Sequence, residues 1–384
     1  MPASVSSPVA PGVTSYVVNA TDDVDDGTCN FAHCSLREAL ELAAYEQGPV
    51  SITFEIPTLD PGYDPSSGVW TIQPTTGYAL PSDVTIDGYV GSAPEAGVRS
   101  IRPGIEIDGT TLAPLGTTGL SVPSNVTLRG LVVTRFQYGI WVRGSNVTVE
   151  GCYVGTDPTG TQAKPNALAG ILVGNGATNA AIRQNLVSGN TGIGIRLFSE
   201  ETSGNTISDN RIGTDVDGSG SLPNQGHGVH FHAGAHDNTV GPGNLIAHNA
   251  GAGVGVDGQA TRGNTVTRNR IHSNRTTGIV LSAGGNGGLA QPVITGASVA
   301  QVTGTACPGC TVEVFSDGWD QGARYEGTTT ADAGGNWTFT AQTRLGGPYL
   351  TATATDSEGN TSELSDSCLV VNNHVWLPLI VRGG

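Results

Sequence analysis

The feature that most constrains the fold of this chain is a short repeat. Residues 204–213 read GNTISDNRIG, and residues 263–272, 59 positions later, read GNTVTRNRIH. A three-residue pattern, asparagine, then leucine or arginine, then valine or isoleucine, begins at Asn185, Asn210, Asn244 and Asn269. Successive asparagines of this series are 25, 34 and 25 residues apart. A repeat of this length with very short strands cannot bury its own apolar face, but stacked copies can.

Two further series accompany the asparagines. Short strands with apolar second and fourth positions begin at Gly139, Gly170, Gly192, Gly228, Gly253 and Gly278. Val-Thr segments follow Asp83, Asn125 and Asn146. Together these patterns predict a parallel β-helix whose coils lie about 4.8 Å apart. Aligned asparagines would then form a hydrogen-bonded ladder at one corner of the helix.

Loops and a cap are also predicted. VGTDPTGTQAKPNA (154–167) and IGTDVDGSGSLPNQ (212–225) begin alike, which predicts loops leaving every second coil on one side. The open edge of such a stack invites aggregation. CSLREALELAAYEQGP predicts a covering helix, because Ser35 and Glu38 have capping-box spacing. Apolar residues follow at helical spacing at Leu36, Ala39, Leu40 and Ala43.

The sequence pattern changes after about residue 288, where the asparagine repeat ends. Alternating strands such as TVEVFSD and NWTFTAQT, separated by turn residues, predict a small β-sandwich. We therefore expect four segments: an N-terminal strand and capping helix (1–49), a β-helix (50–288), a sandwich (289–371) and a terminal strand (372–384). The last strand, especially residues 374–382, either closes its own domain or pairs with an edge on another chain as a homo-oligomer contact.

Composition narrows the function classes. The 384 residues include 57 glycines, only 13% are charged, and the net charge is −16. Lys164 is the single lysine, and no basic stripe suited to nucleic acid is visible. No segment approaches the ~20 apolar residues of a transmembrane helix. MPASVSSPVAPG lacks the features of a signal peptide, so an exported protein would have lost its leader or had it replaced.

Six cysteines indicate the compartment. Cys29 and Cys34 are close in sequence, as are Cys307 and Cys310, which suits two disulfides and an oxidising environment. A zinc ribbon would need two CxxC pairs, and only one is present. We expect Cys152 to be a buried free thiol, and leave the state of Cys368 open.

A family resemblance adds a location. CSLREAL, preceded by VNATDDVDDGTC, resembles the CSLREA motif of secreted bacterial right-handed parallel β-helix proteins. The IGTD, GNTV and GNLIAHN segments are similar to the coils of that group, and PGCTVEVFSDG with GNWTFTA resembles bacterial immunoglobulin-like modules. The resemblance covers nearly the whole chain. It implies an extracellular or cell-surface bacterial protein rather than a particular reaction.

Chemistry on the outer face has two interpretations. We expect one outward column to contain Arg143, Gly174, Arg196, His232, Asp257 and Ser282. The other would contain Trp141, Leu172, Gly194, His230, Gly255 and Val280. His232 between Arg196 and Asp257 would then be a general base for β-elimination on a uronate. Alternatively, the face is simply solvated: residues 170–290 lack Trp and Tyr, and no carboxylate pair converges there.

Metal sites are the second set of candidates. Asp215-Val-Asp217-Gly-Ser219 matches the first half of a calcium loop, but the twelfth position is Gly226 instead of a glutamate. Asp22, Asp23, Asp25 and Asp26 form a second acidic group. His230 and His232 share a strand face at a spacing that can bind a transition metal. Calcium is the cofactor these patterns favour; acidic turns exposed to water are the alternative.

The sequence therefore favours an extracellular structural or adhesive β-helix protein, with head-to-tail assembly through its terminal strand. The alternative is a polysaccharide lyase or glycoside hydrolase acting on an acidic polysaccharide through Arg196, His232 and Asp257. A third reading is a module that binds carbohydrate without turnover.

Overall fold

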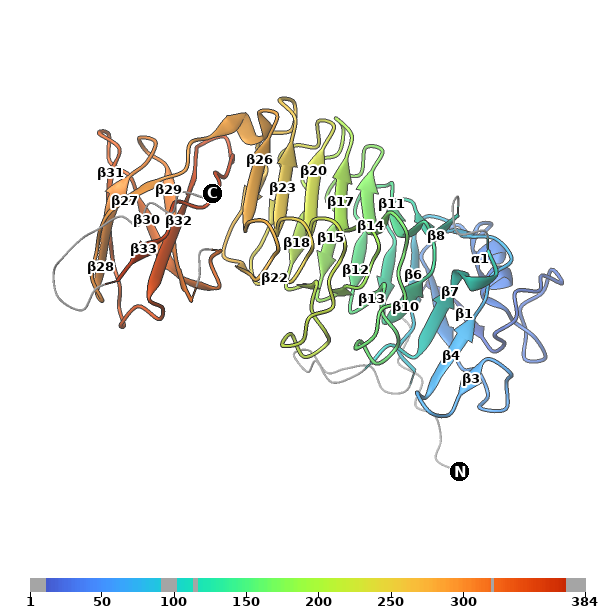
Figure 1. The fold of residues 1–384 in the computed structure, drawn as a ribbon. Coiled ribbons are helices and arrows are strands. Elements are labelled where there is room, and N and C mark those ends of the chain that lie inside the picture. Colours follow the sequence, from blue (N-terminus) through green and yellow to red (C-terminus); the bar gives the residue numbers. More distant parts are fainter. Residues whose placement is uncertain (1–11, 91–101, 113–116, 319–320, 371–384) are drawn as a thin grey trace.

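The chain folds as a stack of short parallel strands with a β-sandwich at one end (Figure 1). The computed structural model describes residues 12–90, 102–112, 117–318 and 321–370. Three sheets, A, B and C, form the solenoid, and their strands pair in parallel except for β3 (Tyr63–Asp64), which is antiparallel to β4 (Val69–Ile72). The one α-helix among the described residues is α1 (Leu36–Ala43). The predicted parallel β-helix followed by a small β-sandwich is confirmed. None of the described helices is long and apolar enough to cross a membrane.

The strands of each sheet come from successive coils. Sheet A consists of β1 (Thr14–Val18), β2 (Val50–Phe54), β6 (Val84–Asp87), β9 (Thr127–Arg129), β12 (Thr148–Glu150), β15 (Ala181–Arg183), β18 (Thr206–Ser208), β21 (Thr239–Val240) and β24 (Thr265–Val266). Sheet B consists of β3 (Tyr63–Asp64), β4 (Val69–Ile72), β7 (Ile105–Asp108), β10 (Leu131–Thr134), β13 (Tyr153–Val154), β16 (Leu186–Val187), β19 (Arg211–Ile212), β22 (Leu245–Ala247) and β25 (Arg270–His272). Sheet C consists of β5 (Tyr78–Ala79), β8 (Thr118–Val122), β11 (Tyr138–Val142), β14 (Ala169–Gly174), β17 (Ile193–Phe198), β20 (Val229–His232), β23 (Val254–Asp257) and β26 (Ile279–Ser282). Short 3₁₀ turns lie at Gly109–Thr111 and Gly285–Gly288.

Stacked aliphatic side chains form the core of the solenoid. In sheet A, for example, Val149 pairs with Leu128 on one side and Ile182 on the other, and all three are fully buried. Each side chain of this kind contributes roughly 1.5–3 kcal/mol when it leaves water. The neighbouring residues on each strand point outward, because side chains alternate along a strand.

Buried asparagines form ladders inside the corners. Asn185 donates from Nδ2 to Oδ1 of Asn210 (3.0 Å), Asn210 does the same to Asn244 (3.0 Å), and Asn244 to Asn269 (2.9 Å). The second amide hydrogen goes to a backbone carbonyl, such as that of Ile182 for Asn210 (2.8 Å). The predicted column that contains Asn210 and Asn269 is therefore confirmed.

The structure contains more ladders than the single one we predicted. A second joins Asn166, Asn190, Asn224, Asn249 and Asn274. A third joins Asn205, Asn238, Asn264 and Asn286. Each of the three corners between sheets thus has its own column, because every corner buries backbone groups that need partners.

The N-terminal edge is covered as predicted by α1. Ser35 caps the helix: its hydroxyl accepts from the Glu38 amide (3.1 Å), and Glu38 accepts from the Ser35 amide (2.7 Å). The apolar face of the helix, with Leu36 and Ala39, is buried in the same core as Val18 and Ile52. In Figure 1 the helix lies at the N-terminal end of the stack.

The β-sandwich covers the opposite edge. It has one three-stranded and one four-stranded antiparallel sheet: β27 (Val293–Ala297), β28 (Gln301–Thr305) and β31 (Asn336–Thr340), and β29 (Thr311–Asp317), β30 (Arg324–Thr330), β32 (Tyr349–Thr355) and β33 (Cys368–Leu369). Phe315 and Leu364 of the sandwich are buried in the core of the solenoid.

Polar groups of the sandwich also accept hydrogen bonds from backbone amides of the last coil. Gln321 accepts the Asn274 amide through Oε1 (2.9 Å), which extends the second asparagine ladder by one step. Thr361 accepts the Val266 amide (2.9 Å), and Glu363 accepts that of Leu281 (2.8 Å). The sandwich is therefore a cap on the β-helix, and the end of the last coil is not an open edge.

Cysteines and loops follow most of the sequence expectations. Disulfides join Cys29 to Cys34 and Cys307 to Cys310, while Cys152 and Cys368 are buried free thiols.

The two related loops leave alternate coils after sheet B and project on the same side (Figure 1). They contact each other where the Val216 amide donates to the Gly160 carbonyl. The terminal segment 372–384, including residues 374–382, lies outside the described residues.

The ladders predict that removing the side-chain amide of one ladder asparagine greatly lowers the free energy of unfolding. Asn244→Ala removes the partners of both Asn210 donors, the side-chain amide and the backbone N–H, and of the Ile207 carbonyl. Buried unpaired groups cost about 1–3 kcal/mol each, so we expect the free energy of unfolding to fall by about 3 kcal/mol or more. Urea unfolding followed by circular dichroism measures this, with the exposed Thr206→Ala in sheet A as control. Equal midpoints for the two variants would contradict a stabilising ladder.

Candidate functional site

The outer face of sheet C carries histidines, aromatic side chains and an arginine in two columns. One column contains Ser121, Trp141, Leu172, Arg196, His230, Gly255 and Val280. The other contains Gly174, Phe198, His232, Asp257 and Ser282. Along each column, neighbouring residues come from successive coils, about 4.8 Å apart.

The predicted place of Arg196 was wrong by one column. Strand β17 pairs Ile195 with Ile171, so Gly194, and not Gly192, aligns with the other strand-initial glycines. A Cβ atom at Gly194 would lie 2.6 Å from the carbonyl oxygen of Gly228 on the next coil, so this position accepts only glycine. Gly192 and Gly194 both precede an isoleucine, which is why the sequence pattern did not distinguish them.

Arg196 and His232 nevertheless meet across the two columns. The guanidinium Nε of Arg196 donates to Nε2 of His232 over 2.6 Å. Because guanidinium groups remain protonated in proteins, Nε2 of His232 must supply the lone pair and Nδ1 must carry the proton. Asp257 lies on the next strand beyond His232 and accepts from the Ser282 hydroxyl (3.1 Å).

Three histidine rings form a stack beside this pair. The ring centres of His227 and His230 are 4.9 Å apart, and those of His230 and His232 are 5.0 Å apart with nearly parallel planes. His227 accepts the Ala252 amide through Nδ1 (3.0 Å), which also fixes its neutral form. Nδ1 of His230 is buried and finds no hydrogen-bond partner among the described residues.

Burial and neighbouring charge keep the stack neutral. Burial lowers the pKa of His232, and the Arg196 cation lowers it further, against a smaller opposing effect of Asp257. For His230, burial together with His227, His232 and Arg196 lowers the pKa to about 4. Burial likewise lowers the pKa of His227. At neutral pH, therefore, the rings are uncharged.

Aromatic side chains extend the face toward earlier coils. Phe198 is 41% exposed, and its ring centre lies 5.1 Å from that of His232. Trp141, half-buried, lies two coils before Arg196 in the same column. The sequence contained no Trp or Tyr within 170–290, and the register is what brings Trp141 onto the same face as the histidines. Aromatic rings flanked by polar groups are typical of saccharide-binding surfaces.

The predicted calcium loop has a different internal arrangement from a cation cage. Oδ1 of Asp215 accepts the Ser219 amide (3.1 Å), and backbone bonds close a tight turn between Thr214 and Ser221. Asp217 and Ser219 are exposed to solvent. Calcium binding by Asp215, Asp217 and Ser219 stays a prediction.

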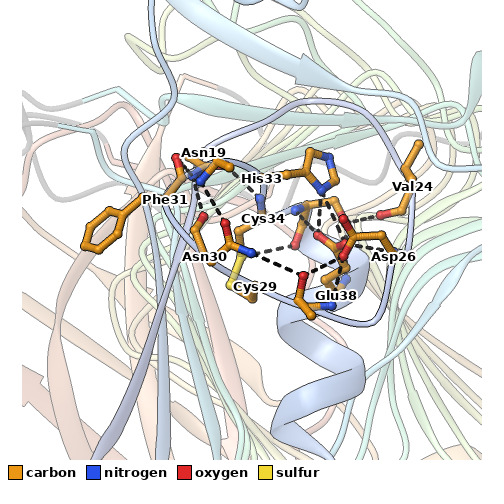
Figure 2. The surroundings of a disulfide bond; sticks show 12 residues. Asn19, Val24, Asp26, Cys29, Asn30, Phe31, His33, Cys34 and Glu38 are labelled. Carbon is orange, nitrogen blue, oxygen red and sulfur yellow. Dashed lines mark hydrogen bonds and ion pairs between the residues drawn. A yellow bond between two sulfur atoms is a disulfide. The ribbon is translucent and has the colours of Figure 1, made fainter.

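Asp26, from the second acidic group, lies near His33 and Glu38 in the surroundings of the first disulfide (Figure 2), whereas Asp23 pairs with Arg37. His33 lies between two carboxylates: Nε2 is 3.0 Å from Asp22, and Nδ1 is 3.1 Å from the fully buried Glu38. Glu38 also accepts the Asp26 amide (2.9 Å). Partial burial opposes protonation, but Asp22 and Glu38 outweigh it and raise the pKa of His33.

These residues could also hold a metal ion by their geometry. One ligand atom from each of Asp26, His33 and Glu38 lies within 4.8 Å of the others. However, Glu38 already accepts two backbone amides, and the ring of His33 contacts carboxylates through both nitrogens. The cluster is thus self-sufficient as an ion-pair network that ties the disulfide loop to α1.

Two family models match the chain. Residues 97–287 match the right-handed beta helix region, and residues 291–368 match the bacterial Ig domain. The solenoid is therefore a right-handed parallel β-helix, and the small sandwich is similar to bacterial immunoglobulin-like domains. No curated protein matches this chain.

Solved structures with a similar fold are distant in sequence. The chain is similar to the A-module of Azotobacter vinelandii mannuronan C-5 epimerase AlgE4 at 14% identity and a TM-score of 0.36, covering 61% of this chain and 63% of that one. It is similar to pectate lyase Pel9A at 16% identity and a TM-score of 0.33, covering 70% and 75%. It is similar to a tailspike protein mutant of E. coli bacteriophage HK620 at 12% identity and a TM-score of 0.23, covering 79% and 68%. The chain spans less than two thirds of the epimerase module, and these likenesses concern the fold alone.

The ion pairs of His33 predict a pH-dependent contribution to stability. Because its folded pKa is raised above 6.5, this contribution is fully present below about pH 6 and is lost as the pH rises through the folded pKa. We expect wild type to be more stable than His33→Gln in mild acid, with the gap closing as the pH rises through the folded pKa of His33. Urea midpoints of both proteins at several pH values measure the gap. A difference that stays constant with pH would show that His33 acts only through packing.

Proposed function

We propose that this protein is an extracellular structural or adhesive protein of bacteria that binds an extended polysaccharide along the outer face of sheet C without cleaving it. The observation that carries the proposal is the strip formed by Trp141, Arg196, Phe198, His232 and Asp257 on a rigid, capped stack. Both ends of the stack are closed, so the strip is held in one geometry and little order has to be created on binding. The two disulfides support an oxidising compartment.

The chemistry of the strip suits a sugar polymer. The exposed ring of Phe198 and the half-buried ring of Trp141 can pack against pyranose faces, and they lie on strands two coils apart, roughly 10 Å. The guanidinium of Arg196 suits a uronate carboxylate, and Asp257 can accept from hydroxyl groups. A polymer that runs across successive coils would meet these groups in turn.

The alternative, a polysaccharide lyase or hydrolase that uses Arg196, His232 and Asp257, is less well supported by the same geometry. A general base needs a free lone pair, but the lone pair of His232 at Nε2 already accepts from Arg196. A glycosidase needs two carboxyl groups on either side of the scissile bond. Asp257 accepts a hydrogen bond from the Ser282 hydroxyl, and no second carboxylate is in the columns of sheet C described above.

A screen of uronate and neutral polysaccharides tests both functions. We expect binding without release of unsaturated or reducing products, and about ten-fold weaker binding for Arg196→Ala, the loss of one charged hydrogen-bonding partner. Arg183→Ala is the matched control, since Arg183 pairs with Glu150 on the outer face of sheet A. Affinity electrophoresis gives the binding, and absorbance of the unsaturated product gives turnover. Turnover that disappears in His232→Ala would establish the enzyme instead.

Assembly through the terminal segment is the finer part of the proposal. HVWLPLIVR (374–382) is an apolar strand-like sequence that follows β33, the edge strand of the four-stranded sheet. An edge strand can receive a further strand from a second copy. We expect a chain that ends at residue 372 to lose multimers detected by light scattering while its circular dichroism is unchanged. An unchanged mass distribution would remove this part of the proposal.

A further inference from the structure

We infer that polysaccharide binding at sheet C is switched by acid: protonation of His232 expels Arg196 from its hydrogen bond and charges the strip, so an anionic polymer binds more tightly as the pH falls. This inference rests on the proposed function and adds its regulation. It also commits the ligand to a polyanion, since a neutral glycan would not respond to the added charge.

The switch follows from the bond between Arg196 and His232. An arginine side chain has only donors, so the 2.6 Å contact exists only while Nε2 of His232 is unprotonated. Once His232 gains a proton at Nε2, two N–H groups and two positive charges face each other. Arg196 must then rotate away, which frees its Nε–H as well as its fork for an anionic ligand.

The groups around His232 set the direction of the response. Arg196 and Phe198 face it from β17, His230 from its own strand, and Asp257 from β23. Asp257 is the single carboxylate among these, and its Oδ1 accepts from Ser282. The environment therefore holds His232 neutral at physiological pH, and a bound carboxylate or sulfate would shift the balance toward the charged form.

The histidine stack broadens the response. His230 lies between His227 and His232, so charging one ring raises the cost of charging the next. His232 would gain its proton below pH 6.5, the ordinary pKa of histidine, and His230 only at still lower pH, near its pKa of about 4. Binding of a polyanion must in turn take up protons, because linkage is reciprocal.

The experiment measures the affinity of the full chain for two probes at constant ionic strength. Dextran sulfate keeps its charge throughout, whereas polygalacturonate is used above about pH 5, where its carboxylates remain ionised. We expect the affinity of wild type for dextran sulfate to rise about ten-fold between about pH 7.5 and pH 4.5, as one added charge pair of about 1.4 kcal/mol would give.

Variants separate the switch from the general effect of acid on an acidic protein. His232→Gln keeps an acceptor for Arg196 but cannot become charged, so we expect its affinity to change less than three-fold over the same range. His248→Gln, which removes a histidine beyond the end of β22 in sheet B, should respond like wild type. A pH response of His232→Gln equal to that of wild type would overturn the inference.

The remaining outcomes distinguish the inference from the proposed function. Binding of dextran sulfate and polygalacturonate that is independent of pH would overturn the switch and leave the proposed function standing. Absence of binding at every pH would overturn both. A measurement without ligand is the NMR titration of the His232 ring. Its midpoint should move to higher pH in Arg196→Ala, and an unchanged midpoint would also refute the proposed switch.

Discussion

The hydrogen bond between stacked asparagine amides is the interaction on which the rest of this structure depends. A single coil has too little apolar surface to fold alone, and its corners bury backbone groups that the sheets do not satisfy. Each asparagine pairs with the next coil through its side chain and with a carbonyl of the previous coil, so one residue serves both needs. The same ladder fixes the register, because a coil displaced by one residue would leave several buried amides unpaired. Each ladder must also end, and for the second ladder, which ends at Asn274, Gln321 of the immunoglobulin-like domain supplies the last acceptor.

Register, in turn, decides which outer side chains meet. The glycine column in sheet C brings adjacent coils so close that a Cβ at Gly194 would collide with the Gly228 carbonyl. Because that column fixes the register, Arg196 pairs with His230 on the next strand. Its side chain reaches diagonally to His232, two residues further along that strand. The alignment of the outer strip is therefore a consequence of inward packing. Its residues point outward, but the residues that align them are buried.

The sequence predicted the coils, the capping helix and one asparagine column, because each depends on letters that recur or on a local motif such as Ser35 with Glu38. The asparagines of the other two ladders recur with similar steps, for example 34 residues between Asn190 and Asn224 as between Asn210 and Asn244, so the sequence contained the signal for these ladders as well. The column of Arg196 was misplaced because Gly192 and Gly194 fit the same alternation. Capping by the immunoglobulin-like domain was not foreseen either, since Gln321, Thr361 and Glu363 are single polar residues without any periodicity. Contacts between domains leave no pattern in one sequence.

A chain with a net charge of −16 should repel a polyanion as a whole. Binding of a polyanion would therefore depend on the charges close to the outer face of sheet C. Mobile ions screen charges over about 8 Å at physiological ionic strength, so a polymer on sheet C responds mainly to the groups of that face. There the charged side chains are few: Arg143, whose Nε donates to Ser121, Arg196 and Asp257, with three histidines held uncharged mainly by burial. Because so few charges contribute, each proton gained by the stack changes the balance of the face substantially. In the proposed switch the histidines need not contact the polysaccharide, because His232 already accepts a hydrogen bond from Arg196, the residue proposed to bind it.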